Sequence, residues 1–465
     1  MRNLFICCDG TWNTPTELQD GVAVPTNVHK FYAALAENGK GKVPQLRYYH
    51  PGVGTEGGHL RRVMDGALGG GLDGNVKSAY KWLCDVYQDD DRIFLIGFSR
   101  GSYTVRSLAG FISRCGILKN VTWNGLDDLY TQYLDGKLTK HSKQPIYFIG
   151  VWDTVGALGI PLKLTWLAAR IVRRHQFHDV KLAPTVQHAF HAVAIDEQRD
   201  DFTPTLWQGP FGNQQVVKQV WFPGVHSDVG GGYKEDGLSD GAFEWMLGNA
   251  ARCGAGFNRD LVRQIKPNHQ GVLHDSFQGV YTLLGCQPRS MPYIDWKSPG
   301  PDIHASALNR QEDPPIQQVP YRKSVHLKPG QSITVDIYAS EAWNWTSVYC
   351  LPGEIYSFAA RGDWMHAGRA IGARGIGWGL CALWHIFNKR NLRARWFELV
   401  GSLGDAGNPD QNGIPAPMSQ FVIGDGVARY TIPNGKGGYL YCFANDKRER
   451  GGVNRGSLEV TIMRV

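Results

Sequence analysis

Apolar positions follow two different periods along the first half of the chain. Short runs without alternation, typical of strands buried on both faces of a parallel sheet, are separated by segments in which apolar residues recur every three or four positions. This pattern predicts an α/β fold, a mostly parallel sheet with helices on both faces. The expected strands are Leu4–Cys8, Arg92–Gly97, Ile146–Trp152 and Val216–Phe222, and the expected helices are Gly74–Tyr87, Tyr103–Ile112 and Thr185–Ile195.

The pattern changes after a proline-rich stretch, 314–320, which we interpret as a linker. Short alternating runs follow, separated by Gly, Asn and Pro turns, as in a small β-sandwich. We therefore predict a catalytic domain at 1–320, with lid or insertion segments around 155–200 and 235–320, and an all-β sandwich domain at 321–465. The strands expected in the second domain include Ser332–Ala339, Ile355–Ala360, Gln420–Ile423 and Leu458–Ile462.

Composition narrows the class of protein. The nine cysteines are odd in number and show no Cys-x-x-Cys spacing, which argues against a zinc site or a disulfide framework and for a reducing compartment. The first apolar run is too short for the core of a signal peptide, so we expect synthesis in the cytoplasm without one. A net charge of +7 favours anionic surfaces, but no basic stripe interleaved with aromatics is present, and nucleic acid is not expected as a partner.

The strongest chemical signal is Gly97-Phe-Ser99-Arg-Gly101, which ends one predicted strand and precedes a predicted helix. In this position a Gly-x-Ser-x-Gly motif is typical of the nucleophile elbow of a serine hydrolase. The two glycines are expected to be small because a side chain there would collide with the neighbouring strand and helix. No cofactor is expected for this chemistry.

A serine nucleophile needs a base and an acid that orients the base. Asp153 and His226 each follow a predicted strand, and they occur after Ser99 in the order that elbow-type hydrolases use. Both would emerge at the carboxyl edge of the sheet, where open α/β folds place their sites. The alternatives are Asp228 for the acid, His274 for the base, and His188 and His191, which we interpret as packing or lid residues.

The oxyanion of the reaction needs two backbone donors. The amide of Arg100, the residue after the nucleophile, is one. Gly10 or Thr11, just after the first strand, is expected to supply the other, while Asp9 could fix that loop by hydrogen bonds.

Several motifs in order resemble a family of α/β hydrolases that includes the type VI secretion phospholipase effectors, over roughly residues 1–300. The resemblance implies a lipid-ester hydrolase with a triad of Ser99, Asp153 and His226. It also implies an antibacterial toxin delivered into rival cells, with a phospholipid membrane surface, a secretion-spike protein and an immunity protein as partners. The motifs are Cys8-Asp-Gly-Thr-Trp-Asn13, Gly52-Val-Gly-Thr55, Gly97-Phe-Ser-Arg-Gly-Ser102, Val151-Trp-Asp-Thr-Val-Gly156, the segment His191 to Glu197, and the segment Trp221 to Tyr233.

Several runs in the last part of the chain form a second set of motifs: Cys350-Leu-Pro-Gly-Glu354, Leu399-Val-Gly401, and Tyr439 to Asp446 followed by Asn454 to Leu458. With these runs, the part from about 335 to 465 resembles the small calcium-dependent galactose-binding lectins of the PA-I type. The resemblance implies that Asp446 and Asn454 match calcium-ligand positions. Cys350, Arg450 and Val453 stand where that family has oxygen ligands, and calcium prefers six to eight oxygens. We therefore expect a lectin-like sandwich that has lost metal-dependent sugar binding.

Three functions stay open at this point. The first is a serine lipid hydrolase of the phospholipase A type, in which the basic segment 161–175 and the apolar segment 375–387 approach the membrane. Both segments are equally compatible with packing inside the protein. The second is a soluble carboxylesterase for small acyl esters, and the third is a glycan- or protein-binding module on a hydrolase scaffold.

Overall fold

The computed structural model describes residues 1–10, 18–52, 70–138, 142–155, 181–278, 285–295, 302–316, 323–377, 389–409, 416–446 and 453–465. These residues form two compact units that interleave along the chain. The first comprises 1–276, 301–318 and 408–415, and the second comprises 277–300, 319–407 and 416–465. Thr11 and the basic segment 161–175 lie outside the described residues, as does most of the apolar segment 375–387.

A six-stranded sheet in the order β4-β1-β5-β6-β7-β8 is the centre of the first unit, and every neighbouring pair is parallel. This confirms the predicted α/β fold. Because all the strands run the same way, their carboxyl ends meet at one edge of the sheet. The strands are β1 (Asn3–Cys8), β4 (Gln45–His50), β5 (Arg92–Phe98), β6 (Ile146–Trp152), β7 (Val186–Ala194) and β8 (Val216–Phe222).

One predicted helix is wrong. The segment 185–195 forms strand β7, which lies between β6 and β8 and has its last six residues buried. A strand buried on both faces needs no polar alternation, so this mixture of alanine, valine and histidine has no period that separates it from a helix.

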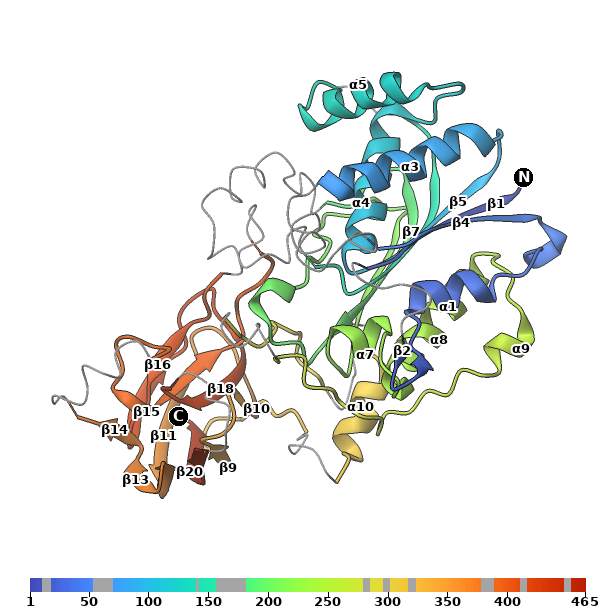
Figure 1. Ribbon diagram of the computed structural model, residues 1–465. Coiled ribbons are helices and arrows are strands. Elements are labelled where there is room, and N and C mark those ends of the chain that lie inside the picture. The colour runs from blue at the N-terminus through green and yellow to red at the C-terminus, as the bar shows by residue number, and fades with distance from the viewer. Residues whose placement is uncertain are drawn as a thin grey trace. The chain divides into compact units, whose positions relative to one another are not determined.

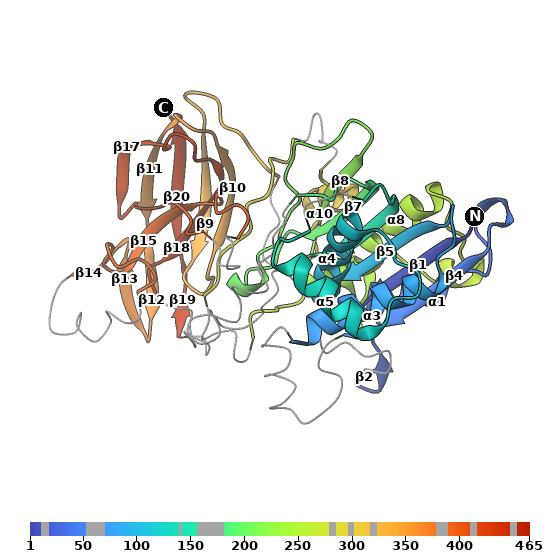
Figure 2. The ribbon, with the colours of Figure 1, turned by 90° about the horizontal axis from the view of Figure 1, so that it is seen from above.

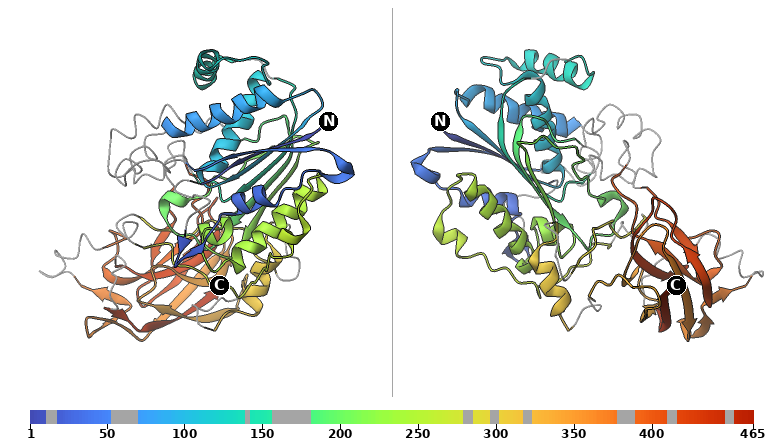
Figure 3. Two further views of the ribbon diagram at one scale, coloured as in Figure 1. Left: turned by 45° about the vertical axis from the view of Figure 1, so that its right-hand side comes forward. Right: turned by 180° about the vertical axis from the view of Figure 1, so that it is seen from behind.

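Helices cover both faces of the sheet (Figure 1). Helices α3 (Gly70–Val86), α4 (Arg100–Cys115) and α5 (Trp123–Leu134) share one buried cluster with the first face. Helices α1 (Asn27–Ala34) and α8 (Gly237–Arg252) share another with the opposite face, as two further views show (Figure 3). Other elements in the described part of this unit are β2 (Leu18–Gln19), β3 (Val22–Ala23), η1 (Lys40–Lys42), η4 (Asp200–Phe202), α7 (His226–Gly230), α9 (Arg259–Val262) and α10 (Ala305–Glu312).

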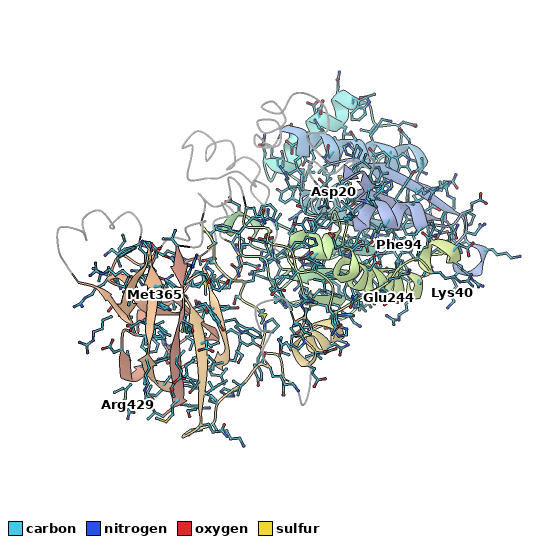
Figure 4. The ribbon with its side chains drawn as sticks, turned by 60° about the horizontal axis from the view of Figure 1, so that its bottom comes forward. Asp20, Lys40, Phe94, Glu244, Met365 and Arg429 are labelled. Carbon is cyan, nitrogen blue, oxygen red and sulfur yellow. The ribbon has the colours of Figure 1, made fainter. Side chains whose placement is uncertain are left out.

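A row of phenylalanine rings crosses the face of the sheet that α1 and α8 cover. Phe5 stacks on Phe94 at 4.5 Å, Phe94 on Phe148 at 5.5 Å, and Phe148 on Phe190 at 5.2 Å between ring centroids. Phe94 is fully buried, whereas Lys40 and Glu244, labelled in the same view, are exposed (Figure 4). Each buried ring contributes about 1.5–3 kcal/mol, so the row fixes the strands whose ends carry the candidate site.

The second unit is built from antiparallel sheets, as the alternating pattern predicts (Figure 2). Strands β10-β18-β15-β14, with β16 beside β15, form one sheet, β17-β11-β20-β9 form a second, and β13-β12-β19 form a third. Their buried residues belong to one core. The strands are β9 (Ser332–Tyr338), β10 (Asn344–Cys350), β11 (Ile355–Arg361), β12 (Asp363–His366), β13 (Arg369–Gly372), β14 (Arg374–Ile376), β15 (Trp396–Leu403), β16 (Gln420–Val422), β17 (Gly426–Thr431), β18 (Gly438–Ala444), β19 (Asn454–Arg455) and β20 (Ser457–Arg464).

None of the helices in the described part of the chain combines the length and the apolar character needed to cross a bilayer.

Candidate active site

Ser99 lies at the sharp turn between β5 and α4, with a positive backbone φ of 56°. Such a conformation is uncommon for a residue with a side chain and persists only where the surroundings enforce it. Here the surroundings are close. A Cβ atom on Gly97 would lie 2.7 Å from the backbone of Gly101, and one on Gly101 would lie 2.0 Å from the carbonyl oxygen of Cys8 in β1. The two glycines therefore let helix α4 start against the sheet.

Asp153 and His226 meet at the carboxyl edge of the same sheet. The Asp153 Oδ2 atom lies 2.6 Å from Nδ1 of His226, and both side chains are buried. The other carboxylate oxygen of Asp153 accepts the amide of Ala194 at 3.0 Å, and its own amide donates to the carbonyl of Ala192 at 2.8 Å. Asp153 also has a positive φ, 38°. Its carboxylate is therefore fixed by β7 while it orients the imidazole.

Aromatic rings enclose the imidazole of His226. The ring of Phe98, the residue before Ser99, lies 4.6 Å away, and the ring of Phe202 lies 4.9 Å away and nearly perpendicular. A Cβ atom on Gly230 would lie 1.9 Å from the Phe98 ring, so a glycine there lets α7 pack against the elbow strand. Burial lowers the pKa of His226 below its ordinary value, while the hydrogen bond and charge of Asp153 act in the opposite direction.

The neutral form of His226 is the one that a general base needs. An Nδ1–H donated to Asp153 leaves Nε2 as the acceptor. In the part of the chain that the structure describes, no hydrogen bond links the Ser99 hydroxyl to His226. Such catalytic hydrogen bonds are often long before substrate binds and tighten in the complex.

The rival residues make other contacts. Asp228 pairs with Nδ1 of His274 at 2.6 Å, accepts the amide of Val225 at 3.0 Å, and so caps α7. His191 is fully buried in β7 and accepts the amide of Thr154 at 3.1 Å. His188 packs edge-on against the Tyr147 ring at 5.2 Å.

The backbone donors predicted for the oxyanion are only partly described. The Arg100 amide belongs to the first residue of α4, where helix amides have no partner within the helix. The Gly10 amide donates to the Asp9 carboxylate at 2.7 Å. Asp9 also accepts the hydroxyls of Thr26 at 2.6 Å and Tyr49 at 2.8 Å, so it fixes the loop after β1.

The sequence analysis assigned no role to two acidic residues that the structure places at the candidate site. Asp196 and Glu197, just after β7, reach the loop before α7: the Asp196 carboxylate accepts the amide of Gly224 at 2.7 Å, and the Glu197 carboxylate accepts that of His226 at 3.3 Å. Both residues directly follow an apolar run in the sequence. Because that run was expected to be a helix and not a strand, the pattern did not place them at the edge of the sheet.

The two side chains expected at calcium-ligand positions, Asp446 and Asn454, form hydrogen bonds with other side chains. The Asp446 carboxylate accepts the indole N–H of Trp396 at 2.8 Å and the side-chain Nδ2–H of Asn454 at 3.1 Å. The side-chain oxygen of Asn454 lies 2.6 Å from Nδ1 of His366. Cys350 is the β-partner of Gly438, at the end of β18 away from Asp446. Among the described residues, no group of three or more His, Cys, Asp and Glu side chains has the arrangement of a metal site.

The family model described as "T6SS, Phospholipase effector Tle1-like, catalytic domain" matches residues 2–145 and 134–249, together more than half of the chain. The chain belongs to this family. Within it, Ser99, Asp153 and His226 all lie in the matched residues. A curated relative, an uncharacterized protein of Saccharomyces cerevisiae, is 29% identical over 239 residues, and the match covers 43% of this chain. It covers 32% of the yeast protein, so the chain spans about a third of that relative's length.

Three solved structures are also similar. An uncharacterized protein from Pseudomonas aeruginosa is 18% identical with a TM-score of 0.36, covering 58% of this chain and 49% of that one. The Tle1 effector bound to the VgrG spike is 17% identical with a TM-score of 0.30, covering 50% and 51%. The N-terminal domain of EclA, described as a PllA-like lectin, is 22% identical with a TM-score of 0.20, covering 29% of this chain and 95% of the lectin.

Proposed function

We propose that this Tle1-like protein is a serine lipid-ester hydrolase of the phospholipase A type, with Ser99 as nucleophile, His226 as base and Asp153 as orienting acid. The observation that supports this most directly is a buried Asp153–His226 pair, 2.6 Å apart, whose imidazole contacts the ring of Phe98, the residue just before a Ser99 held at positive φ. Membership of the phospholipase family supports a lipid ester as substrate.

The reaction follows from the arrangement of these groups. The Ser99 oxygen attacks the ester carbonyl carbon while Nε2 of His226 takes the hydroxyl proton. Asp153 holds the imidazole and stabilises its positive charge. Backbone amides, Arg100 first, stabilise the oxyanion, and the imidazolium then protonates the departing alcohol oxygen. A water molecule, deprotonated by the same imidazole, hydrolyses the acyl-enzyme and releases the fatty acid.

Hydrolysis of phospholipid vesicles tests this proposal. Wild-type protein and Ser99→Ala are incubated with mixed-lipid vesicles, and released fatty acid and lysolipid are identified by mass spectrometry. Removal of the nucleophile is expected to abolish release down to the background, a loss on the order of 10⁶-fold for a triad serine. Activity on short-chain esters alone would instead identify a carboxylesterase. Equal release by both proteins would refute the serine mechanism.

We further propose delivery through a type VI secretion spike, with an immunity protein that protects the producing cell. The family description supports the secretion route. Co-purification of the full chain with a cognate spike protein tests the first partner. Growth of a bacterium that expresses the protein, with and without candidate neighbouring genes, tests the second partner. The wild-type protein is expected to arrest growth, and only one of the neighbouring gene products is expected to restore it. Ser99→Ala is expected to cause no arrest.

A further inference from the structure

The segment after β7 holds the backbone that carries His226. Asp196 binds the Gly224 amide, and its own amide donates to the Gly224 carbonyl at 3.0 Å. Glu197 binds the amide of His226 itself. None of these side chains is one of the three reacting residues, so their role has to be sought in what they hold.

Glu197 makes several contacts in the segment after β7. Its side chain is fully buried and forms an ion pair with Arg199, with the guanidinium Nη2 at 2.8 Å and Nε at 3.0 Å from its two oxygens. It also accepts the Ser276 hydroxyl at 2.9 Å. The guanidinium lies 3.4 Å from the centre of the Phe202 ring, the same ring that contacts His226. The Glu197 carboxylate thus links the backbone of His226, through Arg199, to the Phe202 ring that contacts the imidazole.

We propose, on the basis of the serine-hydrolase function proposed above, that Glu197 and Arg199 are positioning residues for His226. Glu197 fixes the histidine's backbone and the Arg199–Phe202 wall fixes its ring. Their opposite charges also pair with each other beside the imidazole.

The charges that face His226 give the sign of each effect. Asp153 lies against Nδ1 from β6, Glu197 and Arg199 approach from the segment after β7, and Asp228 lies on α7. Asp228 is itself paired with His274, whose second nitrogen lies 3.4 Å from Glu235. Burial and Asp153 have the largest effects on the pKa of His226. Of the smaller effects, the Arg199 charge lowers this pKa and the Glu197 charge raises it.

Two single substitutions therefore have opposite effects on pH dependence. The acid limb of kcat/KM reports the pKa of the free base. Glu197→Gln removes the negative charge, so the limb is expected to move to lower pH. Arg199→Gln removes the positive charge, so the limb is expected to move to higher pH. The double variant, Glu197→Gln with Arg199→Gln, is expected to lie between the two.

The same variants test the positioning itself. Because Glu197 accepts the backbone amide of His226, Glu197→Gln is expected to lower kcat by about 10- to 100-fold through misplacement of the base. KM is expected to stay within about twofold, since no substrate contact is removed.

Asp91→Asn is the matched control. Asp91 also forms an ion pair with an arginine, Arg2, at 2.6 Å, but the pair lies at the amino end of β5, the opposite edge of the sheet. It is expected to reduce the free energy of unfolding and to leave the acid limb unchanged. A limb that moves in the same direction in Glu197→Gln and Arg199→Gln, or that moves equally in the control, would overturn the inference.

NMR titration of the His226 ring separates this inference from the proposed function. If wild-type protein hydrolyses nothing, or Ser99→Ala stays active, the proposed function fails, yet the opposite pKa shifts of His226 in the two variants remain measurable. If hydrolysis depends on Ser99 while neither the ring titration nor kcat responds to Glu197→Gln, the positioning role is refuted.

Discussion

Replacing Asp153 by Asn removes one charge from the buried dyad and almost no volume. The structure allows the amide only two orientations. With its oxygen on the Ala194 amide, the NH₂ group faces Nδ1 of His226, which then has to accept. The imidazole proton is forced onto Nε2, which can no longer take the proton of Ser99.

The reverse orientation restores an acceptor for His226 but turns the NH₂ group toward the N–H of Ala194. Two buried donors then face each other, at a cost of about 1–3 kcal/mol for the lost hydrogen bond. The inactive tautomer is therefore the favoured state. We expect kcat to fall about 10,000-fold, as is typical when the wrong tautomer is locked in place. That fall corresponds to about 5 kcal/mol of transition-state stabilisation.

The assay is ester hydrolysis at saturating substrate, with Ser99→Ala as the background and thermal unfolding as the check that Asp153→Asn is folded. An unfolding midpoint close to that of the wild type, together with the expected loss, supports the tautomer argument. If Asp153→Asn retains more than about a tenth of the wild-type kcat, the tautomer argument is refuted, because locking the wrong tautomer is expected to cost far more activity.

Other predictions follow from single contacts. Gly101→Ala places a methyl group 2.0 Å from a backbone carbonyl of β1, so we expect a loss of about 3 kcal/mol or more in urea unfolding, whereas Gly74→Ala, with open space around it, is expected to gain about 0.5–1 kcal/mol. Burial lowers the pKa of His304 from 6.5 to about 4, so the unfolded chain binds the proton first. Stability is therefore expected to fall from pH 6.5 toward 4 by up to about 3 kcal/mol, and His304→Asn is expected to flatten that slope in pH-dependent unfolding. Calorimetry with calcium is expected to show no micromolar binding by the full chain, because the Asp446 oxygens are occupied; micromolar binding would contradict this reading.

Strands that carry continuous apolar runs were predictable from the sequence, and β5, β6 and β8 lie where the pattern placed them. Two strands of the sheet were not. The short, polar, aromatic segment of β4 lies at the sheet edge, where burial does not impose a pattern. In β7, burial on both faces removed the alternation that distinguishes a strand.

The location of the candidate site was predictable from the order of the strands along the chain. Ser99, Asp153 and His226 each follow a strand, and parallel strands end at one edge. The pairing of Asp228 with His274 was not predictable, because it joins residues 46 positions apart and follows no strand. The role of Glu197 depends on a backbone amide, and a sequence does not show which amide a carboxylate meets.

The strand order also has a consequence for the newly made chain. Ser99 follows β5, whereas His226 comes after β7 and β8 in the sequence, so the imidazole leaves the ribosome later than both of these strands. Pairings between parallel strands are distant in the sequence and form slowly, so we expect the turn at Ser99 to form before the sheet edge that carries His226. The proposed nucleophile therefore stays without its base until the chain has grown past His226.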